Sequence, residues 1–242
     1  MKEKLRGIVL SRIRHNDRTA ILNIYTAERG RMAVAVSAAS GRGASLRNAA
    51  QMPLSQIEFT ADIGRGVGSL PRASSLALTV GYRTIFFDPA KNAVGIFLAE
   101  FLSRYLREAT PDAPTYSYIS RSLLLLDAME RGVGNFHITF LAGLTAFAGI
   151  MPDVEDYSPH AVFDMRAGRY TTLLPVHRDY LQGEAARVPR LLVRLNFANQ
   201  SRLRLNRTRR GEILDGLLRY YALHFPGMTG LKSPEILETI FA

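Results

Sequence analysis

Residues 5–36 read LRGIVLSRIRHNDRTAILNIYTAERGRMAVAV, and this stretch decides the fold of the first part of the chain. Apolar and polar residues alternate over 5–14 and again over 19–26, which is the period of half-buried strands. Glu28, Arg29 and Gly30 supply a tight turn into a third strand at 32–36. The stretch therefore predicts a hairpin followed by a third strand.

Two further strands and one long loop complete the predicted N-terminal domain. Residues 37–50 are rich in small residues and carry Arg42 and Arg47, which indicates a flexible basic loop that closes with a short helical turn. Residues 53–59 and 67–78 read as strands. The segment GRGVG (64–68) between them lacks the Lys-Ser/Thr pair and the strand–helix context of a phosphate-binding loop. Five short strands with one long loop predict a partly open barrel of the OB-fold type, which we assign to residues 1–82.

From about residue 83 the hydrophobic period changes from 2 to 3.6 residues. Apolar residues recur at helical spacing from Val94 to Tyr105, which predicts an amphipathic helix. Residues 116–129 are apolar nearly all round and predict a buried helix. We expect an α+β multidomain chain, in which an all-helical domain at 83–242 follows the barrel. Its further helices are predicted at 135–148, near Tyr180, and at 187–197, 211–225 and 234–241.

Residues 150–180 read as a short irregular insertion in the helical domain. The segment FDMRAGRYTTLL (163–174) predicts a hairpin around Gly168. The spacing of the acidic and histidine residues in this region matches no metal-ligand template, and three prolines mark the region as loop. These residues are Asp153, Glu155, Asp156, His160, Asp164 and His177. We expect neither a metal nor another cofactor.

Charge is the strongest functional signal in the composition. The 242 residues include 31 Lys or Arg and 21 Asp or Glu, a net charge of +10. Of the basic residues, 27 are arginine, whose planar guanidinium binds phosphate in bidentate fashion and stacks on bases. Residues 1–84 carry +8 and residues 187–242 carry +6, around a slightly acidic middle. This segregation is typical of a polyanion-binding protein, and we expect the two basic ends to form one electrostatic surface.

The predicted DNA-binding residues are the arginines of these two ends. In the barrel loops they are Arg29, Arg31, Arg42, Arg47, Arg65 and Arg72. In the C-terminal block RLRLNRTRR (202–210) they are Arg202, Arg204, Arg207, Arg209 and Arg210. Tyr25 and Phe59 lie on strands, where they either face outward and stack bases or pack into the core.

Several function classes are excluded by what the sequence lacks. It contains no G-x-S-x-G, P-loop or H-E-x-x-H motif, so we expect no enzyme. It contains no cysteine, which excludes disulfides, thiolate zinc sites and cysteine nucleophiles. The first residues lack the apolar core of a signal peptide, and no stretch approaches the roughly 18 apolar residues of a membrane span. A cytoplasmic protein is predicted.

Several stretches are typical of one known family. Residues 6–31 form a strand–strand–YT–Gly turn unit, and GRGASLRNAAQMPLSQIEF (41–59) forms a basic loop with a following strand. FDMRAGRY and PVHRDYL follow the central helices, and RRGEILDGLLRYYALHFPGMTGLKSPEILETIF ends the chain. On these stretches the whole chain resembles the RecO family of bacterial DNA-repair proteins. Some members hold the insertion around zinc with four cysteines, whereas here it is zinc-finger-like but cysteine-free. We expect packing of Phe163, Tyr170 and Leu173–Leu174 to hold it, or the insertion to be mobile.

The resemblance implies a function without bond-making. Members of the family bind single- and double-stranded DNA, anneal complementary strands and, with RecR, help load RecA on strands coated by single-stranded-DNA-binding protein. Contact with that coating protein runs through its acidic, phenylalanine-ending tail. Such a tail needs an arginine beside a hydrophobic groove, and the candidates are Arg104, Arg121 and Arg131. The resemblance also implies a place at the nucleoid. The alternative is a non-enzymatic adaptor whose basic ends bind acidic protein or membrane surfaces.

Overall fold

The structure is a computed structural model that describes residues 2–37, 43–63 and 70–241. The chain divides into two compact units, Met1–Ala128 and Met129–Ala242, and each unit is described by itself. The first unit contains the predicted barrel together with two long helices. The predicted division at residue 82 marks the change from strands to helices, and as a domain boundary it stays a prediction.

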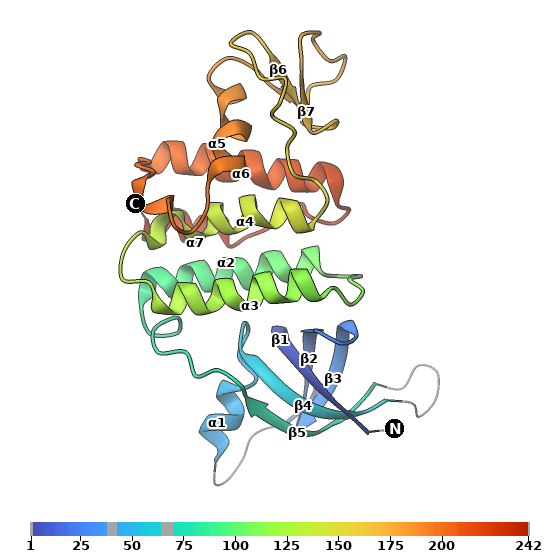
Figure 1. Cartoon of the computed structure of the whole chain (residues 1–242). Coiled ribbons are helices and arrows are strands. Elements are labelled where there is room, and N and C mark those ends of the chain that lie inside the picture. Colours follow the sequence, from blue (N-terminus) through green and yellow to red (C-terminus); the bar gives the residue numbers. More distant parts are fainter. Residues whose placement is uncertain (1, 38–42, 64–69, 242) are drawn as a thin grey trace. The chain divides into compact units, whose positions relative to one another are not determined.

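Five antiparallel strands form the sheet of the first unit (Figure 1), in the order β3-β2-β1-β4-β5. A parallel bridge between Ala35 and Arg72 joins β3 to the segment that leads into β5, so the two edges of the sheet meet and it closes as a barrel. A short helix between the third and fourth strands completes the predicted OB-type arrangement. The bounds are β1 Lys2–Arg14, β2 Thr19–Thr26, β3 Gly30–Ser37, α1 Ala44–Ala49, β4 Gln56–Asp62 and β5 Ala73–Leu78.

The barrel closes around an aliphatic core. Its buried residues include Leu5, Leu22, Ile24, Val34, Val36 and Ile57. A bulge in β1 between Val9 and Ser11 shifts the alternation of the strand, so Ile8, Val9 and Leu10 are all buried. Gly30 adopts a φ of +67°, and a Cβ atom there would lie 2.3 Å from the carbonyl oxygen of Ala109. This turn therefore requires glycine.

Helices α2 (Pro89–Tyr105) and α3 (Ala113–Ala128) complete the first unit. Asp127 near the end of α3 holds the link between β5 and α2, because its carboxylate accepts hydrogen bonds from the backbone N–H groups of Arg83, Thr84 and Ile85 at 2.8–3.0 Å. Partial burial alone would raise the pKa of Asp127, but these hydrogen bonds outweigh it and the pKa is lowered.

The prediction that the helix at 116–129 is buried nearly all round is wrong. Ile119, Leu123 and Leu126 of α3 are fully buried, whereas Leu124 and Leu125 are 42% and 44% exposed. A run of four leucines has no helical period, so the sequence does not show that only one face of the helix is packed.

The second unit is built on α4 (Phe136–Phe147) and α6 (Arg207–His224), with the shorter α5 (Val188–Arg194) and α7 (Pro234–Ile240). Single 3₁₀ turns occur at Val133–Asn135, Ala185–Arg187 and Gln200–Arg202. Helix α6 corresponds to the helix predicted at 211–225, and it buries Ile213, Leu214, Leu217, Tyr220 and Tyr221. Among the described residues, no helix is long and apolar enough to cross a membrane.

The insertion carries a three-stranded sheet in the order β7-β6-β8. Its strands are β6 Val162–Asp164, β7 Arg169–Thr171 and β8 Tyr180–Leu181. The hairpin turns at Gly168 (φ +68°), which confirms the predicted hairpin. The prediction of a helix near Tyr180 is wrong, because Tyr180 pairs with Asp164 in the sheet. A two-residue strand is too short to show a period in the sequence.

Aromatic side chains pack the cysteine-free insertion against α6. The ring of Phe163 lies 5.1 Å from that of Tyr170 and 6.1 Å from that of Tyr220, and all three residues are buried. The predicted contribution of Leu173 and Leu174 is wrong, because they are 78% and 61% exposed. They follow the end of β7 and therefore lie outside the sheet that the aromatic residues pack.

Candidate nucleic-acid interface

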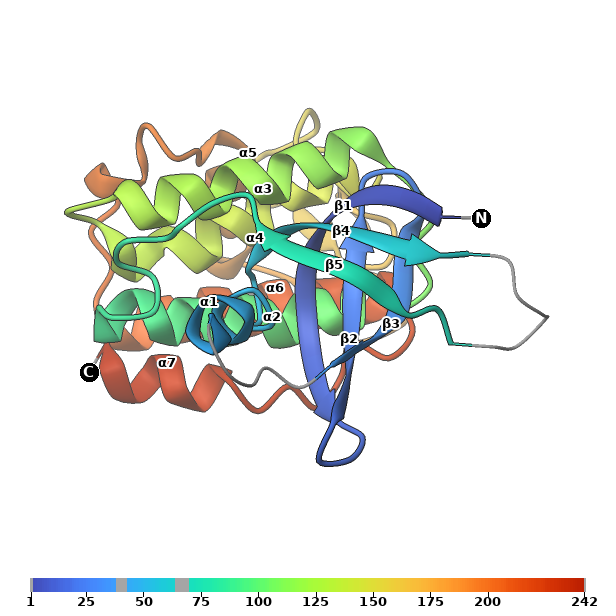
Figure 2. The same cartoon turned by 90° about the horizontal axis from the view of Figure 1, so that it is seen from below.

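The end of β1 and the turn into β2 (residues 12–18, together called the β1–β2 turn) present three arginines that were not among the predicted DNA-binding residues. Arg12, Arg14 and Arg18 are all exposed, and Figure 2 shows this turn extending beyond the other strands of the barrel. Arg14 pairs with Asp17 within the turn. The signal was three arginines within seven positions, two at the end of one predicted strand and one directly before the next. In OB-fold barrels the loop between the first two strands is one of those that bind oligonucleotides.

Two of the predicted barrel arginines face solvent in the same unit. Arg47 lies exposed on α1, and Arg72 lies exposed directly before β5, where the backbone bridge to Ala35 closes the barrel. Arg42, Arg65 and the glycine-rich segment 64–68 lie outside the described residues.

Two other predicted arginines are engaged inside the first unit. Arg29 donates from Nε and Nη2 to the carboxylate of Glu3 at 2.7 and 2.5 Å, and this hydrogen bonding lowers the pKa of Glu3. Arg31 donates from Nη1 to the carbonyl oxygen of Ser103 at 2.7 Å, in the last turn of α2. Partial burial and the nearby Arg107 lower the pKa of Arg31. Arg31 thus satisfies a carbonyl at a helix end, where cations are stabilising.

Both aromatic residues of the strands belong to the interior. Phe59 is 1% exposed and packs in the barrel core. Tyr25 is also 1% exposed, and its ring centroid lies 6.1 Å from that of Tyr116 at the start of α3. Of the two alternatives for these residues, the structure selects core packing, and neither ring is available to stack a base.

The C-terminal arginine block divides into two parts. Arg202, Arg204 and Arg207 are exposed. Arg209 forms an ion pair with Glu212 at 2.9 Å. The block therefore contributes exposed cations chiefly from its first six positions.

Arg210 is the most engaged member of this block. Its Nε donates to Oδ1 of Asn135 at 3.3 Å and its Nη2 donates to the carbonyl oxygen of Leu205 at 3.1 Å. Its guanidinium carbon lies 5.9 Å from the ring centroid of Phe241, and burial lowers the pKa of Arg210. Arg210 ties the beginnings of α4 and α6 together.

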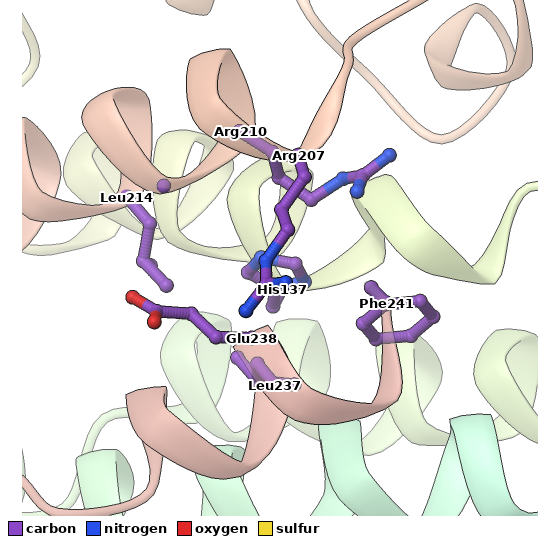
Figure 3. Close-up of a pocket in the computed structure, with 8 residues that line it drawn as sticks. His137, Arg207, Arg210, Leu214, Leu237, Glu238 and Phe241 are labelled. Atoms are coloured by element: carbon purple, nitrogen blue, oxygen red, sulfur yellow. The ribbon is translucent and has the colours of Figure 1, made fainter.

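A narrow pocket lies beside Arg210, between α6 and α7 (Figure 3). Its walls are formed by Arg207, Arg210, Gly211, Leu214, Leu237, Glu238 and Phe241, with His137 of α4 behind them. Its volume is about 20 Å³, room for about one water molecule. Burial, reinforced by the charge of Arg210, lowers the pKa of His137 to about 3, so the imidazole is neutral at pH 7. The pocket places guanidinium groups beside an apolar wall, as recognition of an acidic peptide with an apolar end requires.

The three arginines selected for partner-tail binding lie in different surroundings. Arg104 pairs with Glu100 one turn earlier on α2, at 3.4 Å. Arg121 is exposed on α3, and the exposed Leu124 and Leu125 follow it three and four positions later, on the same face of the helix. Arg131 is exposed in the segment after α3.

The acidic residues of the insertion are used in its turns. The Asp164 carboxylate accepts the backbone N–H groups of Arg166 and Ala167 at 2.9 and 3.0 Å, and it lies 3.3 Å from Nε2 of His177. Within residues 2–37, 43–63 and 70–241, no three His, Cys, Asp or Glu side chains converge to hold a metal ion.

Known proteins match the chain along nearly all of its length. Residues 1–78 match the family model described as "Recombination protein O N terminal", and residues 87–235 match "Recombination protein O C terminal". Curated proteins named DNA repair protein RecO are 36% identical in Phocaeicola vulgatus and 35% identical in Bacteroides fragilis, over 242 residues and 100% of both chains. The RecO protein of Porphyromonas gingivalis is 31% identical over 98% of both chains.

Proposed function

Because the chain belongs to the RecO family of DNA repair proteins, we propose that it binds single- and double-stranded DNA and anneals complementary strands as a recombination mediator at the nucleoid. It does so without bond-making. The observation that carries this proposal is a set of exposed arginines on the OB-type barrel: Arg12 and Arg14 at the end of β1, Arg18 in the turn that follows, Arg47 on α1, and Arg72 directly before β5. Phosphate contacts from such residues supply sequence-independent affinity.

The C-terminal block supplies a second phosphate-binding group in this proposal. Its contributors are Arg202, Arg204 and Arg207, which are exposed in the second unit. Arg31 and Arg210 take a smaller part, because they are half-buried and donate to backbone carbonyl oxygens within the chain. Arg14, Arg29 and Arg209 each pair with a carboxylate and exchange that partner for a phosphate when DNA binds.

The proposed protein partners are RecR and single-stranded-DNA-binding protein, which together connect the chain indirectly to RecA. For the acidic tail of the coating protein we favour the α6–α7 pocket over Arg104, Arg121 and Arg131. The pocket is concave and joins Arg207 to the apolar Leu237 and Phe241, whereas Leu124 and Leu125 beside Arg121 are exposed on a helix face. Since the pocket has room for only about one water, this proposal requires the pocket to widen when a phenyl ring enters.

The tail site is tested with an acidic peptide that ends in phenylalanine. Fluorescence anisotropy should show Arg207→Ala weakening the peptide about tenfold and Arg121→Ala leaving it unchanged. A charged hydrogen bond to the tail, worth about 1.5 kcal/mol, accounts for that factor. The opposite order of the two variants would place the tail on α3 and reject the pocket.

Salt titration separates DNA binding from the adaptor alternative. A phosphate-binding protein loses affinity log-linearly with salt, with a slope of roughly 0.7 per phosphate contact on single strands and 0.9 on duplex. We expect such slopes for oligonucleotides of any sequence. An adaptor for acidic proteins or membranes would not bind them, and that result would reject the proposed function.

A further inference from the structure

The barrel strands have no exposed Phe, Tyr or Trp ring with which to stack a base. Residues 1–78 contain no tryptophan, and their only Phe and Tyr residues are Tyr25 and Phe59, each 1% exposed. Aromatic stacking contributes about 1–3 kcal/mol per base in single-strand-binding OB folds. This barrel therefore binds without that contribution.

The outer face of β2 and β3 likewise carries short side chains with few polar groups. Ile21 faces Ala35 and Asn23 faces Ala33 across the two strands, and all four residues are half-buried. Asn23 donates its side-chain N–H to the hydroxyl of Ser11 at 2.9 Å, so one of its polar groups is used within the sheet. This is the face along which OB-fold barrels bind oligonucleotides, and it offers a strand little that distinguishes one base from another.

Exposed cations lie at one end of this face. Arg18 lies in the β1–β2 turn directly before Thr19, and Arg72 bridges to Ala35, which pairs with Ile21 near the start of β2. Arginines at such positions reach the phosphates of a strand, and phosphate contacts carry no sequence information.

We propose that the barrel holds a DNA strand by its phosphates and leaves the bases facing away from the protein. The bound strand then pairs with its complement without first dissociating, and a strand that has lost bases binds as well as an intact one. This inference rests on the proposed DNA binding and names its ligand, which is the nucleic-acid backbone.

Two groups compete with this assignment. His15 lies exposed in the β1–β2 turn, and histidine rings can stack on bases. Phe87, outside the barrel and directly before α2, is 79% exposed. The experiment has to detect a base held by either ring.

The test compares an intact oligonucleotide with a fully abasic one of the same length, using the whole chain at one salt concentration. We expect dissociation constants within threefold of each other, equal salt slopes, and ratios that His15→Ala and Phe87→Ala leave unchanged. One stacked base would weaken the abasic strand by about 5- to 150-fold. A ratio above fivefold overturns the inference, and a ratio that either variant abolishes names the ring responsible. Failure to bind the intact strand would instead reject the proposed function.

Chemical footprinting reports where the bases face. Dimethyl sulfate attacks the pairing edges of adenine and cytosine, and we expect these bases in the bound strand to react within about twofold of the free strand. Arg72→Ala should lower occupancy without changing the reactivity of bases that remain bound. Protection of the pairing edges in the wild-type complex would overturn the inference even if abasic DNA bound well.

Discussion

The β1–β2 turn and the C-terminal block are both dense in arginine, yet they use it differently. In the turn only Arg14 has a carboxylate partner, and the side chains of Arg12 and Arg18 extend into solvent. In the block, Arg209 and Arg210 donate to Glu212, Asn135 and the carbonyl oxygen of Leu205. The difference shows that arginine density does not by itself tell how many guanidinium donors face solvent.

The same division runs through the barrel itself. Arg31 and Arg72 were predicted for the same role, but Arg31 donates to the last turn of α2, whereas Arg72 is exposed. Arg31 belongs with Arg210 as an arginine that joins elements, and Arg72 belongs with Arg12.

The largest effect is expected when the β1–β2 turn loses its charge. The triple variant Arg12→Ala, Arg14→Ala and Arg18→Ala should reduce the magnitude of the single-strand salt slope by about 2, and the affinity at 0.1 M salt about a hundredfold. Unfolding in urea should barely change, because exposed charges contribute little to folding. An unchanged slope would show that the β1–β2 turn does not contact DNA, and the proposed role of its exposed arginines would be wrong.

Replacing Arg31 or Arg210, which donate hydrogen bonds between elements, should lower the stability of the fold and leave the salt slope nearly unchanged. Arg31→Ala leaves the Ser103 carbonyl without its charged donor and should lower the free energy of unfolding by about 1.5–3 kcal/mol. Urea titration measures this loss, and Arg31→Lys is the control that keeps the charge while losing the guanidinium geometry. If Arg31→Ala lowers the salt slope but not the stability, Arg31 belongs with the exposed group.

Because His137 is buried beside Arg210, the free energy of unfolding of the second unit should fall as the pH is lowered. The native pKa of His137 is lowered to about 3, so below about pH 6.5 the unfolded chain takes up a proton that the native state does not. This group's contribution to stability is intact above pH 6.5 and is lost at roughly 1.4 kcal/mol per unit as the pH falls toward 3.

Unfolding measured between pH 6.5 and 5 isolates this effect. Asp127 and Asp179 have lowered pKa values, and their contributions are lost only nearer pH 4 and below. His137→Phe should flatten the slope above pH 5, whatever it does to stability at pH 7. A slope that persists in this variant would assign the acid sensitivity to another group.

The smallest effect is expected for a single exposed arginine of the block. Arg207→Ala should lower the magnitude of the single-strand slope by about 0.7 and the affinity about fivefold at 0.1 M salt. Combined with Arg72→Ala, the two losses should add if both basic ends contact one strand without sharing a phosphate. If Arg207→Ala acts and Arg72→Ala does not, the C-terminal block binds DNA without the barrel.

Most of the architecture could be predicted from sequence because it depends on local periodicity. The alternation over residues 5–36 and the change of period near residue 83 reflect the face of the strand or helix on which each residue lies. These patterns therefore indicated the barrel strands and helices such as α2 and α6. The short β8, the exposed Leu124 and Leu125, and the exposed Leu173 and Leu174 escaped this reasoning. Their environment depends on segments distant in sequence.

Arginine content and its segregation are properties of the chain alone, and they were enough to predict a polyanion as the ligand. Which guanidinium groups are used inside the protein was decided by tertiary structure, because carbonyl, amide and carboxylate groups from distant segments accept their hydrogen bonds. Ser103 lies 72 positions from Arg31, and Asn135 lies 75 positions from Arg210. Tyr25 is hidden by Tyr116 in the same way. No local pattern encodes such contacts, since they form only when the folded chain brings distant segments together.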